Sequence, residues 1–95
     1  MTSQMKTLLI LNPAAGKGKG KKIFSKIHSL LKKNIDSLKV ETSLYPGHIY
    51  EIGQNAIREG YQKIITIGGD GTPFELINGL YSSGKPEYEI QLGMI

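Results

Sequence analysis

The chemistry in this sequence is concentrated in Gly68-Gly69-Asp70-Gly71-Thr72, which follows the apolar run 64–67. Three glycines in four positions let the backbone turn sharply and approach a ligand closely, because glycine has no Cβ atom. Thr72, Pro73 and Glu75 match a capping box with proline at the first helical position, so the spacing predicts a helix start here. A helix N-terminus directs free N–H groups and its positive dipole end at an anion. We therefore expect this turn to bind a phosphate.

A second glycine-rich loop follows the first apolar run, residues 8–11. It consists of Asn12, Pro13, Ala14, Ala15, Gly16, Lys17, Gly18, Lys19 and Gly20. Pro13 cannot donate to a sheet ladder and so ends the strand, and loops at the carboxyl ends of strands bind ligands in open α/β sheets. The loop matches neither the P-loop nor the dinucleotide fingerprint, because Lys21 stands where each requires glycine. By itself this loop is weak evidence for a ligand site, and the interpretation depends on the glycine turn at Gly68.

The elements that must position these loops alternate between strands and helices. The apolar pattern predicts strands at 6–11, 39–44, 64–67 and 89–95, and helices at 21–34, 48–59 and 73–82. Gly60 is expected to end the second helix in the left-handed conformation. Right-handed crossovers place such helices on the faces of a parallel sheet, so the order predicts an α/β fold with three α/β/α layers.

Each predicted helix has an apolar stripe that we expect to face the sheet. His28 lies beside the first stripe and is expected to be a partly exposed helix residue. His48, near the N-terminus of the second helix, is expected either to form hydrogen bonds as a neutral group or to cap the helix. The inward residues are predicted to be Ile23, Phe24, Ile27, Leu30 and Leu31, then Ile49, Ile52, Ala56 and Ile57, then Phe74, Ile77, Leu80 and Tyr81.

Polar candidates follow the first three predicted strands. Asn12, Ser43 and Gly68 share one edge of the sheet if these strands are neighbours, which predicts a single ligand site. Ser43 has two interpretations, as a hydroxyl that satisfies nearby backbone groups or as a hydrogen-bond donor to the ligand.

Length and composition limit the class of protein. The 95 residues suit one small domain, so we expect a single α/β domain over residues 1–95. The sequence has no cysteine and no apolar stretch of bilayer length, and its first four residues are too short and polar for a signal peptide. These features predict a cytoplasmic address.

The net charge of +4 depends on one basic segment, in which seven lysines lie between Lys17 and Lys33. A solvated helix face with a basic loop explains this segment as well as a phosphate contact or a membrane-surface contact does. Nucleic acid is not expected as a partner, because the lysines lack interleaved aromatic residues and no nucleic-acid motif surrounds them.

The motifs resemble the diacylglycerol kinase catalytic domain family, which includes sphingosine, ceramide and bacterial lipid kinases. Residues 12–16 are similar to its Asn-Pro-x-x-Gly motif, and residues 68–79 to its Gly-Gly-Asp-Gly-Thr-x-x-Glu-x-x-Asn-Gly signature. Ser43, ahead of Pro46-Gly47-His48, is similar to a third element in which threonine is usual. Phe74 replaces a small polar residue of the family, which bears on contacts to phosphate or metal, and Ile49 replaces an alanine.

The resemblance implies an ATP-dependent lipid kinase, with the nucleotide in a cleft between this N-terminal domain and a larger β-rich domain. ATP and Mg²⁺ are the implied cofactors, and Asp70 is the implied catalytic residue. Asp70 would hold the metal or act as base toward the lipid hydroxyl, unless it only stabilises its own turn. The implied nucleotide contacts are Asn12, Pro13, Ala14, Ala15, Gly16, Ser43, Gly68, Gly69, Asp70, Gly71, Thr72 and Glu75.

The family's chains are much longer, so the resemblance predicts a fragment without the C-terminal lipid-binding domain, inactive by itself. The substrate would be diacylglycerol or a sphingoid base, which the sequence does not distinguish, met during transient contact with a membrane surface. One alternative is an NAD kinase, which has a similar turn, but Glu75 and Asn78-Gly79 favour a lipid kinase. Another is a non-catalytic basic module that binds anionic membrane or nucleic acid.

Overall fold

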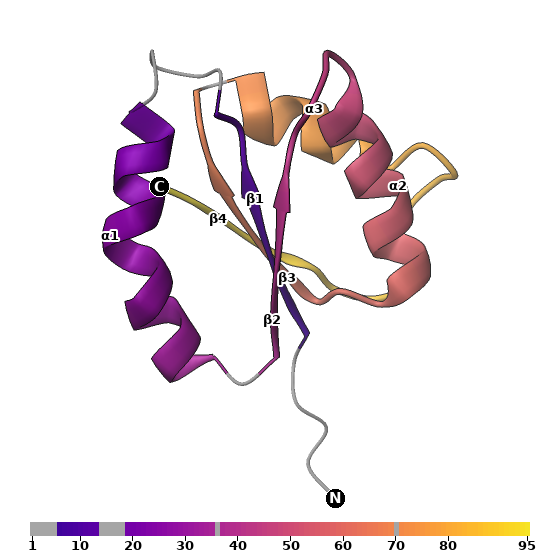
Figure 1. The fold of residues 1–95 in the computed structure, drawn as a ribbon. Coiled ribbons are helices and arrows are strands. Elements are labelled where there is room, and N and C mark those ends of the chain that lie inside the picture. Colours follow the sequence, from indigo (N-terminus) through magenta and orange to yellow (C-terminus); the bar gives the residue numbers. More distant parts are fainter. Residues whose placement is uncertain (1–5, 14–18, 36, 70) are drawn as a thin grey trace, which may run out of the picture.

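Strands and helices alternate along the chain, as the apolar pattern predicts (Figure 1). The computed structural model describes residues 6–13, 19–35, 37–69 and 71–95. The bounds of α2 and the left-handed Gly60 that ends it, at φ 79°, are confirmed, and every other predicted end lies within two residues of the observed one. The elements are β1 (Thr7–Leu11), α1 (Lys19–Asn34), β2 (Leu38–Thr42), α2 (His48–Glu59), β3 (Lys63–Ile67), α3 (Gly71–Leu80) and β4 (Gln91–Met94).

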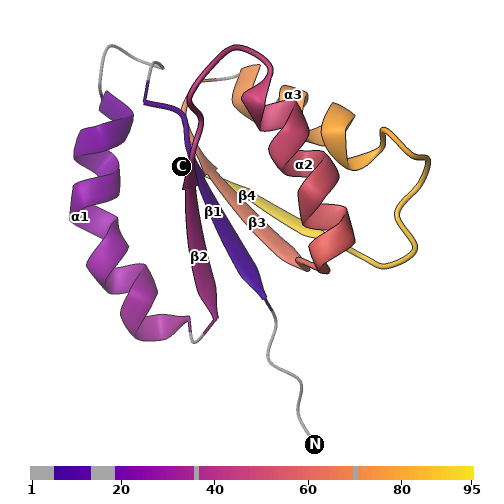
Figure 2. The same cartoon turned by 45° about the vertical axis from the view of Figure 1, so that its right-hand side comes forward.

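The four strands form one parallel sheet in the order β2-β1-β3-β4. Leu9 of β1 lies opposite Val40 of β2 on one side and Ile65 of β3 on the other. Helix α1 covers one face of the sheet, while α2 and α3 cover the other (Figure 2), which confirms the three-layer α/β/α prediction. Because β1 lies between β2 and β3, the ends of these three strands meet at one edge.

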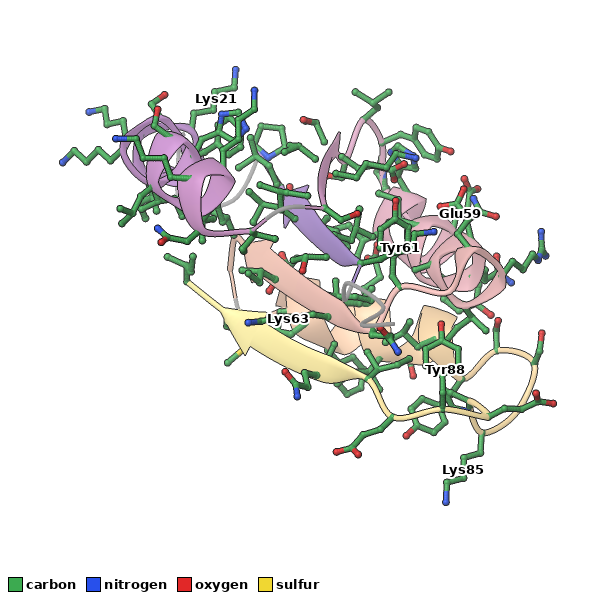
Figure 3. All side chains as sticks on the ribbon, turned by 90° about the horizontal axis from the view of Figure 1, so that it is seen from below. Lys21, Glu59, Tyr61, Lys63, Lys85 and Tyr88 are labelled. Carbon is green, nitrogen blue, oxygen red and sulfur yellow. The ribbon has the colours of Figure 1, made fainter. Side chains whose placement is uncertain are left out.

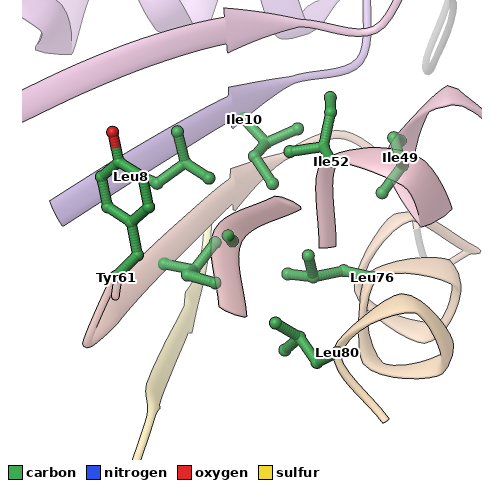
Figure 4. Close-up of a cluster of buried hydrophobic side chains, with 9 residues drawn as sticks. Leu8, Ile10, Ile49, Ile52, Tyr61, Leu76 and Leu80 are labelled. Carbon is green, nitrogen blue, oxygen red and sulfur yellow. The ribbon is translucent and has the colours of Figure 1, made fainter. Parts of the chain in front are cut away.

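Strands β1 and β3 are buried on both faces. No residue of β1 is more than 5% exposed, and residues 64–67 of β3 are at most 8% exposed. On the α2 and α3 side, their apolar residues pack against side chains of both helices (Figure 4). On the α1 side, Leu9, Leu11, Ile65 and Ile67 contact the partly buried stripe Ile23, Phe24, Ile27 and Leu31.

Helices α2 and α3 approach so closely that their backbones are in contact at two glycines. A Cβ atom on Gly79 would lie 2.2 Å from the carbonyl oxygen of Tyr50, and one on Gly53 would lie 2.8 Å from that of Leu76. Neither distance leaves room for a side chain. The two glycines therefore set the separation of the helices that cover this face.

The predicted inward face of the third helix is largely wrong. Phe74, Ile77 and Tyr81 are 71%, 40% and 53% exposed, and of the predicted residues only Leu80 is buried. The buried stripe is Thr72, Leu76, Gly79 and Leu80, which has helical spacing but includes a hydroxyl and a glycine that no apolar pattern selects. In α1, Leu30 was also predicted to face inward but is 61% exposed. None of the described helices combines the length and apolar character needed to cross a bilayer.

Candidate functional site

The side chain of Asn12 connects two other elements at the carboxyl edge of the sheet. Its Nδ2 donates a hydrogen bond to Thr72 Oγ1 at 3.3 Å, and its Oδ1 accepts one from Ser43 Oγ at 3.4 Å. Backbone bonds of 2.9 Å continue the sheet at this point, from Asn12 N–H to the Ile67 carbonyl and from Ser43 N–H to the Leu11 carbonyl. The structure thus brings Asn12, Ser43 and Thr72 together from β1, β2 and α3.

Gly68 makes room for this polar cluster. A Cβ atom on Gly68 would lie 2.7 Å from Thr72 Oγ1 and 3.0 Å from Asn12 Cβ. The predicted close approach at this glycine is therefore to the protein's own side chains. At Gly71, by contrast, an added Cβ atom would meet none of the described residues within 4 Å.

The predicted capping box is wrong, because Thr72 lies inside α3. Thr72 is 3% exposed, its hydroxyl accepts the Asn12 hydrogen bond, and its N–H donates to the Gly69 carbonyl at 3.1 Å. Glu75 Oε2 instead accepts the backbone N–H of Tyr50 at 3.3 Å. This N–H belongs to the first turn of α2, where donors lack partners within the helix and a negative charge is favourable. Glu75 therefore connects α3 to the start of α2.

The turn between β2 and α2 is held by His48. Its Nδ1 accepts the backbone N–H of Leu44 at 2.9 Å, and its ring stacks on Tyr45 with the ring centroids 4.4 Å apart. Tyr45 in turn donates its hydroxyl hydrogen to Glu51, and this hydrogen bond raises the pKa of Tyr45. His48 thus accepts a hydrogen bond from the loop before α2, whereas the N-cap position of that helix is held by Gly47.

No pattern in the sequence pairs Tyr45 with Glu51, because their hydrogen bond joins a loop residue to a helix residue. His28, in contrast, is partly exposed as expected, and it stacks on Phe24 at a centroid distance of 4.6 Å.

A cavity of about 360 Å³ opens beside this cluster. It gathers four of the predicted site residues and adds the turn that precedes α2. A second cavity, of about 410 Å³, lies between the end of α3 and β4 and includes none of the predicted site residues. The site cavity is lined by Asn12, Pro13, Ser43, Leu44, Tyr45, Pro46, Gly47, Ile49 and Glu75.

Several predicted site residues lie outside the described part of the chain. These are Ala14, Ala15, Gly16 and Asp70, so the structure does not place the predicted metal ligand. Among the described residues, no three or more histidine, cysteine or acidic side chains gather in a way that could hold a metal ion. What the described residues provide is an edge where Asn12 joins Ser43 to Thr72, next to the first turn of α3, whose N–H groups suit an anion.

Comparison with known proteins gives a consistent match. Residues 6–95 match the diacylglycerol kinase catalytic domain. The chain is 45% identical over 81 residues to sphingoid long chain base kinase 5 of Saccharomyces cerevisiae, covering 84% of this chain and 12% of that protein. It is 32% identical over 84 residues to sphingosine kinase B of Dictyostelium discoideum, covering 88% of this chain and 11% of that protein.

A solved structure agrees with the fold. A diacylglycerol kinase from Bacillus anthracis superimposes with a TM-score of 0.80 at 33% identity, and the match covers all of this chain and 34% of that one. The chain therefore spans about a third of the solved relative and about an eighth of the yeast relative.

Proposed function

The chain belongs to the diacylglycerol kinase catalytic domain family, and we propose that it forms the ATP-binding domain of a lipid kinase. The enzyme would transfer the γ-phosphate of ATP to a lipid hydroxyl, of diacylglycerol or a sphingoid base. Membership of a kinase family implies the use of ATP, and the names of the relatives support a lipid acceptor. The observation that carries the proposal is the Asn12 side chain, which connects Ser43 and Thr72 at the sheet edge.

The proposed mechanism assigns positioning to the described residues. Phosphoryl transfer depends on positioning and on neutralising charge, with ATP supplying the phosphoryl group and Mg²⁺ compensating its charge. The first turn of α3, which begins at Gly71, would receive a phosphate on its N–H groups. Asn12 and Ser43 would fix the edge against which the nucleotide lies. We propose that Asp70 binds Mg²⁺ or acts as base toward the lipid hydroxyl. Residues 14–16 would contact the nucleotide.

The lipid pocket is proposed to lie outside residues 1–95, in a second domain that completes the cleft. The solved relative is about three times as long as this chain, which supports that division. We therefore expect the 95-residue chain to form no phospholipid when incubated with ATP, Mg²⁺ and diacylglycerol or sphingoid bases. Phospholipid formation by this chain would disprove the division. Phosphorylation of NAD by a longer protein that contains residues 1–95 would favour the NAD kinase alternative.

The nucleotide site is tested by replacing Asn12 with aspartate. In Asn12→Asp the Ser43 and Thr72 hydroxyls can both still donate hydrogen bonds, so the fold should persist, but a carboxylate now faces the phosphates. We expect ATP affinity, measured by calorimetry, to fall at least about tenfold, since like charges a few ångströms apart repel strongly.

Asn55→Asp is the matched control, because it makes the same change of charge at an exposed position in α2. ATP affinity should be nearly unchanged in this variant. Equal losses in the two variants, or none in Asn12→Asp, would contradict a nucleotide site at Asn12.

A further inference from the structure

The outward face of α1 carries lysines without compensating acids. The helix contains no aspartate or glutamate. Within the described part of the chain these lysines form no ion pair, and the one observed joins Lys39 to Glu41 on β2. Figure 3 shows Lys21 at the surface beside α1. We call this surface the α1 basic face, and its exposed lysines are Lys21, Lys22, Lys26, Lys32 and Lys33.

Helix stability does not account for all of this charge. Lys32 and Lys33 lie in the last turn, where the helix dipole favours cations, but Lys21 and Lys22 lie near the N-terminus, where it disfavours them. Lys22 and Lys26 are also four residues apart, so their like charges repel along the helix. These unfavourable interactions point to a negatively charged partner outside the chain.

We propose that the α1 basic face docks on the surface of an anionic lipid bilayer. Lys22, Lys26 and Lys33 lie on one stripe of the helix, and Leu30, 61% exposed, lies on the same stripe between them. A row of lysines that contains an exposed leucine suits an interface where ammonium groups meet lipid phosphates and an apolar side chain enters the headgroup boundary. Stacking of nucleic-acid bases is not favoured here, because Phe24 packs toward the sheet and the His28 ring already stacks on it.

The position of α1 gives this docking a consequence for the site. Its N-terminus lies at the same edge of the sheet as the end of β1 (Figure 1), and a Cβ atom on Gly20 would lie 3.3 Å from the Asn12 carbonyl oxygen. A bilayer against α1 would therefore lie beside the nucleotide site. The basic face is an observation that does not depend on the proposed lipid kinase function. The choice of a bilayer as its anionic partner does rest on that function.

Co-sedimentation of the 95-residue chain with vesicles tests the proposal. Vesicles of phosphatidylcholine with 30% phosphatidylserine should bind the chain at 50 mM NaCl and release it at 500 mM, while pure phosphatidylcholine vesicles should bind little. Replacing Lys22, Lys26 and Lys33 with glutamine should lower the partition coefficient at least about tenfold. The urea midpoint of this variant should be unchanged or higher, because the unfavourable charges in α1 are removed.

The control removes three charges from other elements, by replacing Arg58, Lys63 and Lys85 with glutamine. Both triple variants have the same net charge, so binding that depends on the α1 basic face should survive in the control. Equal losses in the two variants, no binding to the anionic vesicles, or tighter binding to an oligonucleotide than to vesicles would each overturn the proposal. The vesicle assay contains no ATP, so its outcome does not depend on whether the nucleotide proposal holds.

Discussion

At the scale of single residues, the site depends on one amide that has a donor and an acceptor in the same plane. Asn12 uses its NH₂ group toward Thr72 and its carbonyl oxygen toward Ser43, which connects α3 to β2 through β1. An acceptor-only residue here, as in Asn12→Asp, would keep both partners only if the Thr72 hydroxyl became the donor. The geometry also explains why Thr72 is buried although its side chain is polar.

Gly68 leaves room for this cluster because it has no side chain, so a larger residue at this position should disturb the cluster. In Gly68→Ala the new methyl group would lie 2.7 Å from Thr72 Oγ1, so Asn12 and Thr72 must move apart. We expect a loss of about 1–3 kcal/mol in the free energy of unfolding, as for other overpacked sites, together with weaker ATP binding. Urea unfolding and calorimetry measure the two effects.

Gly93→Ala is the control for this change, because its methyl group would meet Ile65 Cγ1 at an ordinary 3.6 Å. It should leave ATP affinity unchanged. A Gly68→Ala protein with the stability and ATP affinity of the unsubstituted chain would show that the cluster adjusts freely.

The sequence could predict which residues meet at this edge, but not how they bond. Parallel strands that alternate with helices bring Asn12, Ser43 and Gly68 to one rim, and the strand order confirms this. The hydrogen bond from Asn12 to Thr72 joins positions 60 residues apart, and no local pattern contains it. The capping box failed for the same reason, since a tertiary partner took the Thr72 hydroxyl and another took the Glu75 carboxylate.

At the scale of elements, the pairing of α2 with α3 depends on backbone contact. Apolar periodicity predicted the inward face of α2 correctly because Ile49, Ile52 and Ala56 fill it with side chains. It failed for α3 because the buried stripe includes Gly79. This residue has no side chain, and its backbone lies next to the Tyr50 carbonyl. Glycine counts as neutral in an apolar pattern, although here it permits the closest contact between the two helices.

Replacing Gly79 with alanine should therefore separate the helices. Its Cβ atom would lie 2.2 Å from a backbone oxygen, which cannot rotate away as a side chain can. We expect the free energy of unfolding to fall by about 3 kcal/mol or more, at or above the usual range for overpacking. Urea unfolding followed by circular dichroism measures this loss.

Gly71→Ala provides the comparison within the same helix, where the added methyl group meets nothing within 4 Å. Its stability should stay equal or rise by up to about 1 kcal/mol, because alanine favours the helix. If Gly79→Ala behaved like Gly71→Ala, backbone contact would not control the α2 and α3 pairing.

At the scale of the whole molecule, ionisable groups on separate elements make stability depend on pH in the same direction. Burial raises the pKa of Tyr61 and of Tyr88 above the ordinary value, although the nearby Lys39 partly opposes this for Tyr61. The hydrogen bond with Glu41 raises the pKa of Lys39. In each case the folded protein holds a proton that the unfolded chain releases at lower pH.

The sign of the effect follows from this proton balance. Above about pH 10 the unfolded chain binds fewer protons than the folded one, so the free energy of unfolding must fall as pH rises. This contribution is fully present below that pH and is lost as the pH passes through the folded-state pKa values. Urea unfolding between pH 8 and 11 should show the decline. In Tyr61→Phe the decline should be shallower, because the hydroxyl whose pKa burial raises is gone. A free energy of unfolding that stays level up to pH 11, or a Tyr61→Phe slope equal to that of the unsubstituted chain, would contradict this origin of alkaline instability.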